Sequence, residues 1–339
     1  MDELSYYRAG RQLIPEIDVL LKGRFRILQA IQVAGPLGRR TLADFLQATE
    51  REVRKETTLL HEQQLIEIGQ KGMICTQVGY QVLEQLKPLY YELSGLWQKE
   101  QKLAERFGIE RVVIIPGSFQ SEASRILLGK EASKLLAGLV EEGSNIAVTG
   151  GSSVATIAPY LQPVHHLPSA TFIAARSGMG KEMSQQANIL VSQFAQACHA
   201  SYKTLFLPEF LSEQAYAAMK AEPSVQDIIR LYEQVDIVLH GIGTAQAMAE
   251  KRGSSEEEKA LLKEKGAVGE AFGYYFDEEG TIVHQIRTIC IQPEHVKQSR
   301  HVLAIAGGVE KVEAIEAYFK NAAKQTIFIT DEAAANEML

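Results

Sequence analysis

The chain has 339 residues, 46% hydrophobic and 23% charged, which is enough for two globular domains, each with its own buried core. Because no apolar run approaches the roughly 18 residues of a membrane helix, and because the start lacks the basic and apolar regions of a secretion signal, we expect a cytoplasmic protein without membrane contact. The formal net charge is −7, yet residues 1–100 carry 13 basic and 13 acidic side chains, so the excess negative charge lies in residues 101–339 and any nucleic-acid contact is expected from the N-terminal part.

Residues 17–64 predict three helices in succession. Apolar side chains recur at helical spacing over residues 17–33 until Gly35-Pro36 ends the pattern, and a short second helix is expected over residues 40–47. Thr49 and Glu52 then form an S/T-x-x-E capping box, in which each side chain satisfies a backbone N–H of the other residue. We therefore expect a third helix over residues 50–64.

The third predicted helix has two chemically different faces. Its apolar face carries Val53, Thr57 and Leu60. Its basic face carries residues at positions i, i+3, i+4 and i+7, namely Arg51, Arg54, Lys55 and Thr58. A recognition helix needs such a pair of faces, since one packs on the core and the other meets DNA. A merely solvated basic face is the alternative.

Residues 65–76 read as two short strands around residues 69–72, with Lys71 at the tip. Three helices followed by a hairpin is the order of a winged helix-turn-helix, which we assign to residues 1–76. Residues 22–71 also hold nine basic and six acidic side chains, which favours contact with double-stranded operator DNA. The predicted DNA contacts are Arg39, Arg40, Arg51, Arg54, Lys55, Thr58 and Lys71.

Residues 77–106 predict a linker helix, because leucines recur at helical spacing without any strand signal. Pro88 is expected to kink this helix or to split it in two, since proline removes a backbone donor and clashes with the preceding turn. The apolar stripe has two possible roles, which are pairing of two chains and packing against the next domain.

From residue 107 to 339 short β-branched runs alternate with amphipathic helices, which predicts a doubly wound α/β domain with a mostly parallel sheet and helices on both faces. The expected strands are residues 112–115, 145–149, 170–174, 203–207, 237–240, 301–306 and 326–330. Ligands of such sheets bind at the carboxyl ends of the strands.

Four of these strand ends carry glycines, hydroxyls or cations. The first runs into a loop suited to an anion, because glycines let the backbone approach, the start of the next helix attracts negative charge, and two serines add donors. The other ends offer Arg176, the pair Gly241 and Gly243, and the glycines before Lys311. A glycine turn or a cation paired with a structural carboxylate such as Glu270 is the alternative at any single position. The sequence lacks the glycine signatures of nucleotide sites.

One of these ends resembles a known enzyme family. Residues 236–247 are similar to the D-x-x-L-L-G-M-G-x-D-G-H segment of sugar-phosphate isomerases, deaminases and lactonases, but alanines stand at the catalytic positions, Ala245 and Ala247. Without that acid/base pair we expect no enzyme activity. The rival hypothesis is an isomerase or deaminase that works through Glu270, Asp277 or His284.

With the predicted N-terminal domain in front, the chain resembles the SorC/DeoR-type sugar-responsive transcription regulators over nearly its whole length, and most closely the branch that controls central glycolytic genes in Gram-positive bacteria. The resemblance rests on Gly38-Arg-Arg, Val148-Thr-Gly-Gly, Gln186-Ala-Asn, His240-Gly-Ile-Gly, Glu270-Ala-Phe-Gly-Tyr-Tyr-Phe, Ala306-Gly-Gly and Lys311-Val-Glu-Ala-Ile-Glu-Ala-Tyr-Phe. It implies a dimeric or tetrameric repressor, glycolytic operon promoters as targets, and fructose 1,6-bisphosphate as the effector; another sugar or polyol phosphate is the alternative.

The resemblance also assigns roles in the pocket. The loop from Thr149 to Ser153 would bind one phosphate, Arg176, Lys251 and Lys311 would serve the other, and Gln186 and Glu270 would meet sugar hydroxyls. The full set of expected effector contacts is Thr149, Gly150, Gly151, Ser152, Ser153, Arg176, Gln186, Gly241, Gly243, Lys251, Glu270, Gly307, Gly308 and Lys311.

No metal or cofactor is expected. Neither the three cysteines nor the eight histidines stand at the spacing of metal ligands, so we expect buried, reduced thiols at Cys75, Cys198 and Cys290.

Overall fold

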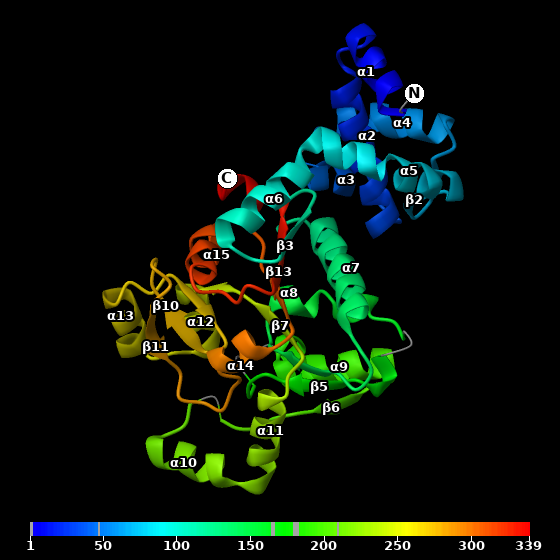
Figure 1. The fold of residues 1–339 in the computed structure, drawn as a ribbon. Coiled ribbons are helices and arrows are strands. Elements are labelled where there is room, and N and C mark those ends of the chain that lie inside the picture. The colour runs from blue at the N-terminus through cyan, green and yellow to red at the C-terminus, as the bar shows by residue number, and fades with distance from the viewer. Residues whose placement is uncertain (1–2, 47, 164–166, 179–182, 209) are drawn as a thin grey trace. The chain divides into compact units, whose positions relative to one another are not determined.

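The computed structural model describes residues 3–46, 48–163, 167–178, 183–208 and 210–339, which divide into two compact units (Figure 1). Residues 1–99 with 121–126 make the first unit, and residues 100–120 with 127–339 make the second.

The first unit contains the predicted three helices and hairpin. Its elements are α1 Glu3–Leu13, α2 Ile17–Ala34, α3 Arg39–Leu46, α4 Glu50–Glu62, β1 Ile66–Gly69, β2 Gly72–Cys75 and α5 Gln77–Ser94. The helices α2, α3 and α4 lie within two residues of their predicted bounds, apart from residue 47, which lies outside the described residues. The sequence did not predict α1, which an ion pair of 3.0 Å between Arg11 and Asp18 links to α2.

The core of the first unit forms between α2 and the elements that follow it. Side chains of α2, α3, α4 and the hairpin are buried together, including Ile31, Leu42 and Val53. Tyr90 of α5 stacks on Phe25 of α2 with ring centroids 4.2 Å apart. The first half of the predicted linker therefore packs on the helices that precede it in the chain.

The linker breaks at a different residue from the one predicted. Helix α5 continues through Pro88 to Ser94, and α6, Leu96–Phe107, follows after Gly95. Gly95 has a φ of +67°, the left-handed conformation that ends helices and that glycine adopts most readily. The split is thus made by a glycine cap and does not fall at Pro88, while the kink predicted as the other outcome at Pro88 stays a prediction.

The second unit is built on a seven-stranded sheet in which every pair of neighbours is parallel. The strands are β3 Arg111–Ile115, β4 Asn145–Val148, β5 Thr171–Ala174, β6 Ser201–Lys203, β7 Ile237–Gly241, β12 His301–Ile305 and β13 Thr326–Asp331, in the order β3-β13-β12-β7-β4-β5-β6. Six of these strands begin and end within one residue of their predicted bounds, which confirms those predictions.

The strand predicted at residues 203–207 lies earlier in the chain, as β6. The reason is Asn188, whose side chain donates to the Leu205 carbonyl and accepts from the Leu205 N–H, both over 2.8 Å. This amide takes the hydrogen bonds that a neighbouring strand would otherwise supply, so the chain leaves the sheet after Lys203.

Helices cover both faces of the sheet, as predicted. Alternate residues such as Ile146, Leu239 and Leu303 pack in one buried cluster with residues of α7 and α9. On the opposite face, Phe328 of β13 contacts Phe319 of α15 with ring centroids 4.6 Å apart. The helices are α7 Glu122–Leu139, α8 Ser152–Ala155, α9 Ala187–Cys198, α10 Glu213–Ala221, α11 Pro223–Glu233, α12 Ala245–Arg252, α13 Glu256–Glu264, α14 Pro293–Gln298, α15 Val312–Phe319 and α16 Glu332–Glu337, with short 3-10 turns at Ala158–Tyr160, Leu167–Ser169, Met183–Gln185 and Val309–Lys311.

A second, antiparallel sheet that the sequence did not predict stands beside the first. Its strands are β8 Gly243–Thr244, β9 Gly269–Ala271, β10 Tyr274–Phe276 and β11 Ile282–Gln285, in the order β11-β10-β9-β8. The turn between β9 and β10 consists of Phe272 and Gly273, which have φ angles of +60° and +96°. A phenylalanine rarely adopts this left-handed conformation, so the backbone is strained there.

Candidate functional site

The strand order places side by side the four strand ends that carry glycines, hydroxyls or cations. From β4 the chain moves through β5 to β6 on one side, and β7, β12 and β13 continue on the other, so the direction reverses between β4 and β7. Ligands of open α/β sheets bind at such a reversal. The four ends that the sequence singled out follow β5, β4, β7 and β12, which are consecutive neighbours in the sheet.

The loop after β4 is held close to β7. The Gly241 N–H donates to the Thr149 hydroxyl over 3.3 Å, and the Thr149 N–H donates to the Leu239 carbonyl over 2.9 Å. Gly151 has a φ of +125°, and the helix after it, α8, is only one turn long. A helix of one turn has only a small dipole, so the predicted attraction of this helix start for an anion is weak. The donors that this loop offers to an anion are backbone N–H groups and the serine hydroxyls.

A cavity of about 190 Å³ lies at this reversal point. Most of the predicted effector contacts line it, namely Thr149, Gly150, Gly151, Ser152, Ser153, Arg176, Gly241, Gly243, Lys251, Glu270 and Lys311. Ile242, Thr244, Ala247, Met248, Phe272 and Glu310 complete the described lining and were not predicted as contacts. Residues up to 162 positions apart in the sequence thus meet around one chamber.

Three predicted contacts do not belong to the described lining of this cavity. Gln186 is the N-cap residue of α9, and the carbonyl of its neighbour Gln185 accepts from the Gly151 N–H over 2.8 Å. Gly307 and Gly308 form the turn before Lys311, where the Gly308 N–H donates to the Asp331 carboxylate over 2.6 Å. The direct effector contact predicted for these residues stays a prediction.

The described lining of the cavity contains more positive than negative side chains. Arg176, Lys251 and Lys311 line it together with the carboxylates Glu270 and Glu310. Burial lowers the pKa of Lys311, and the nearby Lys251 ammonium lowers it further, while Glu310 opposes the change. Such neighbouring cations are stabilised by an anionic ligand, which relieves their mutual repulsion.

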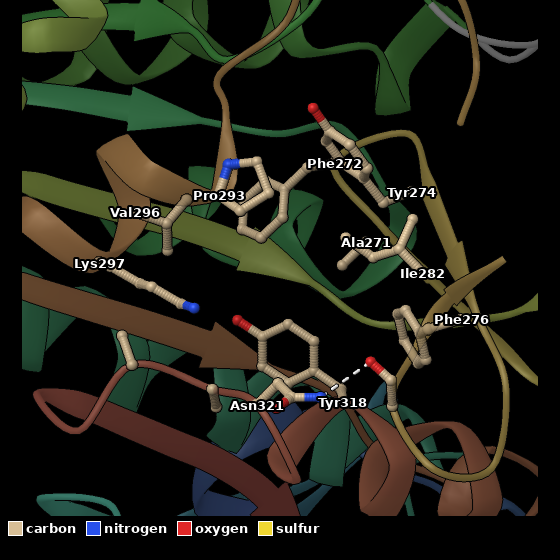
Figure 2. A pocket seen from close by; sticks show the side chains of 13 residues that line it. Ala271, Phe272, Tyr274, Phe276, Ile282, Pro293, Val296, Lys297, Tyr318 and Asn321 are labelled. Carbon is tan, nitrogen blue, oxygen red and sulfur yellow. Dashed lines mark hydrogen bonds between the residues drawn. The ribbon is translucent and has the colours of Figure 1, made fainter. Parts of the chain in front are cut away.

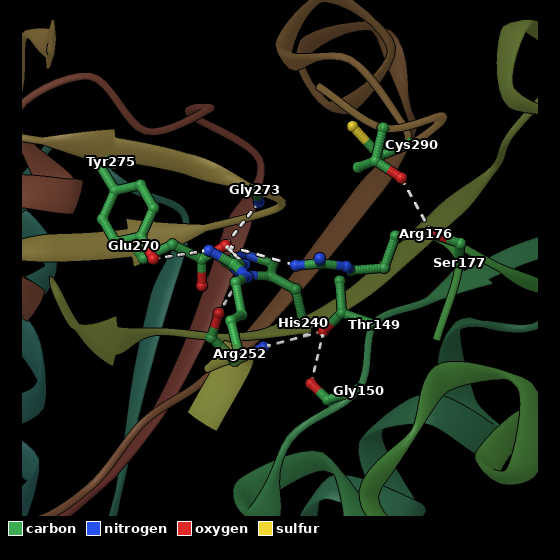
Figure 3. A network of polar contacts seen from close by, with 12 residues as sticks. Thr149, Gly150, Arg176, Ser177, His240, Arg252, Glu270, Gly273, Tyr275 and Cys290 are labelled. Atoms are coloured by element: carbon green, nitrogen blue, oxygen red, sulfur yellow. Dashed lines mark hydrogen bonds and ion pairs between the residues drawn. The ribbon is translucent and has the colours of Figure 1, made fainter. Parts of the chain in front are cut away.

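Glu270 is the centre of a buried ionic network (Figure 3). Arg252 donates to its carboxylate over 2.6 Å, the Gly273 N–H donates over 2.5 Å, and Arg176 lies 3.6 Å away. Arg252 also donates to the Tyr275 hydroxyl over 2.8 Å. Burial raises the pKa of Glu270, but the two guanidinium groups and these hydrogen bonds outweigh it, so its pKa lies below the ordinary value.

Arg176 thus forms the ion pair with Glu270 that was the alternative to effector binding. It nevertheless also lines the cavity. The sequence missed Arg252, whose side chain is completely buried. Its position directly after Lys251 was visible in the sequence, but nothing in the local pattern distinguishes a buried arginine from a solvated one.

The acid/base candidates of the rival enzyme hypothesis lie in different places. Ala247 lines the cavity where the related enzymes carry a catalytic histidine, and Glu270 is already bound to Arg252. Asp277 accepts from the Thr281 N–H over 2.9 Å within its own turn, and His284 lies 3.2 Å from Glu258. Neither Asp277 nor His284 belongs to the cavity lining in the described part of the chain.

The predicted DNA-contact residues of the first unit lie at its surface. Arg51, Arg54, Lys55 and Thr58 are exposed on α4, opposite the buried Val53, Thr57 and Leu60. Thr49 caps the helix as predicted, because it accepts from the Glu52 N–H over 3.3 Å while Glu52 accepts from the Thr49 N–H over 2.9 Å. Arg40 and Lys71 are exposed and Arg39 is half-buried.

None of the helices formed by the described residues is long and apolar enough to cross a membrane. Within the same residues, no group of three or more histidines, cysteines, aspartates or glutamates is placed to hold a metal ion.

Two family models together match almost the whole chain. Residues 20–90 match the CggR N-terminal DNA binding domain, and residues 91–339 match a sugar-binding domain. The central glycolytic genes regulator of Priestia megaterium is 39% identical over 99% of this chain and 98% of its own length. The regulator of the same name from Bacillus subtilis is 34% identical over 98% of both chains.

Solved structures resemble this chain over most of its length. A SorC family transcriptional regulator from Enterococcus faecalis aligns with a TM-score of 0.67 and 38% identity, covering 71% of this chain and 99% of that one. The full-length sorbitol operon regulator SorC from Klebsiella pneumoniae aligns with a TM-score of 0.66 over 89% of this chain and 94% of that one. Its identity is 19%, so this second likeness concerns the fold.

Proposed function

The chain belongs to the family of sugar-binding transcriptional regulators that includes the central glycolytic genes regulators, and from this premise we propose that it is a repressor of glycolytic genes. It binds operator DNA through a winged helix-turn-helix in its first unit. A phosphorylated sugar, fructose 1,6-bisphosphate, occupies the cavity of its second unit and modulates that binding.

The observation that carries this proposal is the convergence of a glycine-serine loop and three cations on one cavity, in a chain whose N-terminal part matches a DNA-binding domain. The loop from Thr149 to Ser153 supplies backbone and hydroxyl donors for one phosphate. Arg176, Lys251 and Lys311 supply charge for a second phosphate. A bisphosphate uses both subsites, whereas a monophosphate leaves part of the positive charge uncompensated.

On the DNA side, the basic face of α4 is the recognition surface and the hairpin β1–β2 is the wing. Arg54 and its exposed neighbours contact phosphates and base edges, while Lys71 at the hairpin tip adds a backbone contact. The chain acts as a dimer or tetramer, because a two-fold arrangement of recognition helices matches two operator half-sites. Effector binding alters the spacing or the cooperative contacts of these helices through the path of α5 and α6.

We further propose that the cavity binds without catalysis. Alanine at positions 245 and 247 removes the acid/base pair of the related enzymes, and Glu270, a buried carboxylate of the described cavity lining, is bound by two guanidinium groups. Incubation of the purified protein with fructose 6-phosphate or glucosamine 6-phosphate is expected to yield no product. Formation of product would contradict this proposal and support the enzyme hypothesis.

The deciding experiment is fluorescence anisotropy of a labelled DNA fragment from the region upstream of the operon that holds this gene, titrated with protein with and without millimolar fructose 1,6-bisphosphate. We expect tight binding that the bisphosphate weakens or makes less cooperative. Tight binding indifferent to the sugar would reject the effector, and absence of binding would reject the regulator.

Two variants separate the modules. Arg54→Ala is expected to weaken DNA binding and to lower the salt dependence by roughly one unit of slope, with sugar affinity intact. Lys311→Ala is expected to weaken bisphosphate binding and leave DNA binding intact. Lys134→Ala, an exposed lysine of the second unit, is the matched control and should change neither. An equal loss of both activities in either test variant, with the fold preserved, would contradict the assignment.

A further inference from the structure

A second cavity of the second unit lies next to the first. It has a volume of about 120 Å³ and is bounded by the second sheet, α14 and the end of α15 (Figure 2). Its walls are mostly apolar and include four aromatic rings, Phe272, Tyr274, Phe276 and Tyr318. An apolar cavity of ~150 Å³ accommodates benzene. This cavity is somewhat smaller but half-open to solvent, so a single six-membered ring can enter it with its substituents toward the opening. Phe272 also lines the first cavity and thus forms a wall common to both.

A buried histidine behind the cavity wall, His240, decides whether the Tyr318 hydroxyl donates or accepts a hydrogen bond. His240 Nδ1 lies 3.0 Å from the Gly241 carbonyl, which can only accept, so Nδ1 carries the proton. Burial lowers the pKa of His240 to about 4, so the ring is neutral near pH 7 and its Nε2 is an acceptor. Tyr318 Oη lies 3.0 Å from this Nε2 and must therefore donate its only proton to His240.

The Tyr318 oxygen is consequently an acceptor toward the cavity, because its proton is already engaged. Lys297 supplies the complementary group. Its side chain is exposed on α14, lines the cavity, and extends toward the Tyr318 hydroxyl in Figure 2. The described lining thus offers aromatic walls, the Tyr318 oxygen as an acceptor and Lys297 as a cation.

We propose that this cavity is a second small-molecule site, which takes a monocyclic aromatic carboxylate that also bears a hydroxyl group. The ring packs among Phe272, Tyr274 and Phe276, the ligand hydroxyl donates to Tyr318, and the carboxylate pairs with Lys297. This site is distinct from the sugar-phosphate cavity, and the proposal does not depend on which sugar that cavity binds.

The test uses the full chain and 3-hydroxybenzoate as the probe. Its binding is measured by isothermal titration calorimetry and by ligand-observed NMR. We expect saturable binding at one site per chain with a Kd of about 1 mM or tighter. Benzoate lacks the donor and 3-hydroxybenzamide lacks the charge, so each is expected to bind at least about fivefold more weakly. Absence of saturable binding of 3-hydroxybenzoate at 10 mM, or equal affinity for benzoate, would overturn the assignment.

Two variants locate the site. Lys297→Gln is expected to weaken 3-hydroxybenzoate binding about tenfold while leaving the affinity for 3-hydroxybenzamide unchanged, because only the ion pair is lost. Ala322→Trp fills the cavity and should abolish binding of both. Lys324→Gln, an exposed lysine outside the cavity lining, is the control and should bind as the parent does. Unchanged binding of 3-hydroxybenzoate by Lys297→Gln would overturn the proposal even if Ala322→Trp did not fold.

Discussion

Replacing Arg252 with methionine removes the best-buried charge of the ionic network while keeping most of the side-chain volume. In the parent protein the guanidinium donates to Glu270 over 2.6 Å and to Tyr275 over 2.8 Å, and its side chain is completely buried. Arg252→Met leaves Glu270 with the Gly273 N–H and with Arg176 at 3.6 Å. The carboxylate thus loses its closest cation, the group that does most to lower its pKa.

Breaking a buried ion pair by removing one partner costs about 3–5 kcal/mol. Because Gly273 and Arg176 remain, we expect the lower end, about 3 kcal/mol at pH 7.5. For a unit of this size that loss lowers the melting temperature by roughly 6–12 °C. Since the pKa of Glu270 lies below its ordinary value, the contribution of the network is complete above the usual carboxyl range and is lost as the pH falls. The difference between parent and variant should therefore shrink at acid pH.

Differential scanning calorimetry at pH 7.5 and at about pH 4, below the ordinary glutamate pKa of 4.5, measures this loss. Arg230→Met is the matched control, because Arg230 is exposed and paired with Asp227 one turn away, and it should shift the melting temperature by less than about 2 °C. The double variant Arg252→Met/Glu270→Gln removes the unpaired charge and should regain at least half of the lost stability. If single and double variants melt together, the loss comes from packing and the electrostatic argument is wrong.

Three further predictions concern other parts of the chain. Thr49→Ala should destabilise the first unit by about 1 kcal/mol through loss of the α4 cap, whereas Thr58→Ala on the exposed face should stay within about 0.5 kcal/mol by urea unfolding. Burial lowers the pKa of His240 to about 4, so the folded protein keeps this ring neutral and its contribution to stability is present above about pH 6.5 and is lost toward pH 4. His240→Asn should therefore reduce the rise of unfolding free energy with pH between these values by up to about 1.4 kcal/mol per pH unit. An unchanged dependence of the unfolding free energy on pH would contradict this prediction. Burial raises the pKa of each cysteine thiol to about 11, but Cys75 is only half-buried, contrary to the expectation from sequence, whereas Cys198 and Cys290 are buried. A disulfide-exchange dye at pH 8 should therefore label Cys198 and Cys290 only after unfolding, and labelling of these two at the rate of a free thiol would disprove this.

Those parts of the fold that rest on local patterns could be predicted. The spacing of apolar residues placed α2 and α4 because a helix with one buried face repeats its pattern every three to four residues. The capping box at Thr49 fixed the start of α4 for the same reason, since all its partners lie within one turn. The strand ends of the candidate site were visible because glycines and cations directly follow β-branched runs.

Other parts depend on contacts between distant residues. The strands β8 and β9 have two and three residues, too few for a periodic signal, and form only because they pair with each other and with β10. The end of β6 depends on Asn188, fifteen or more positions upstream. Arg252 and Lys251 are adjacent and chemically alike, and only the packing of α12 decides which one is buried against Glu270.

The strained turn at Phe272 also bears on how such a chain can change over generations. A left-handed phenylalanine costs roughly 1–2 kcal/mol, which glycine at the same position would not. Replacement by glycine would recover that energy and would also delete the ring that separates the two cavities. Loss of the buried ring costs about 3–5 kcal/mol, of which the released strain offsets a part. One substitution would thus join two small chambers into a larger one at a reduced thermodynamic penalty, which gives descendants of this sequence a short evolutionary route to bulkier ligands.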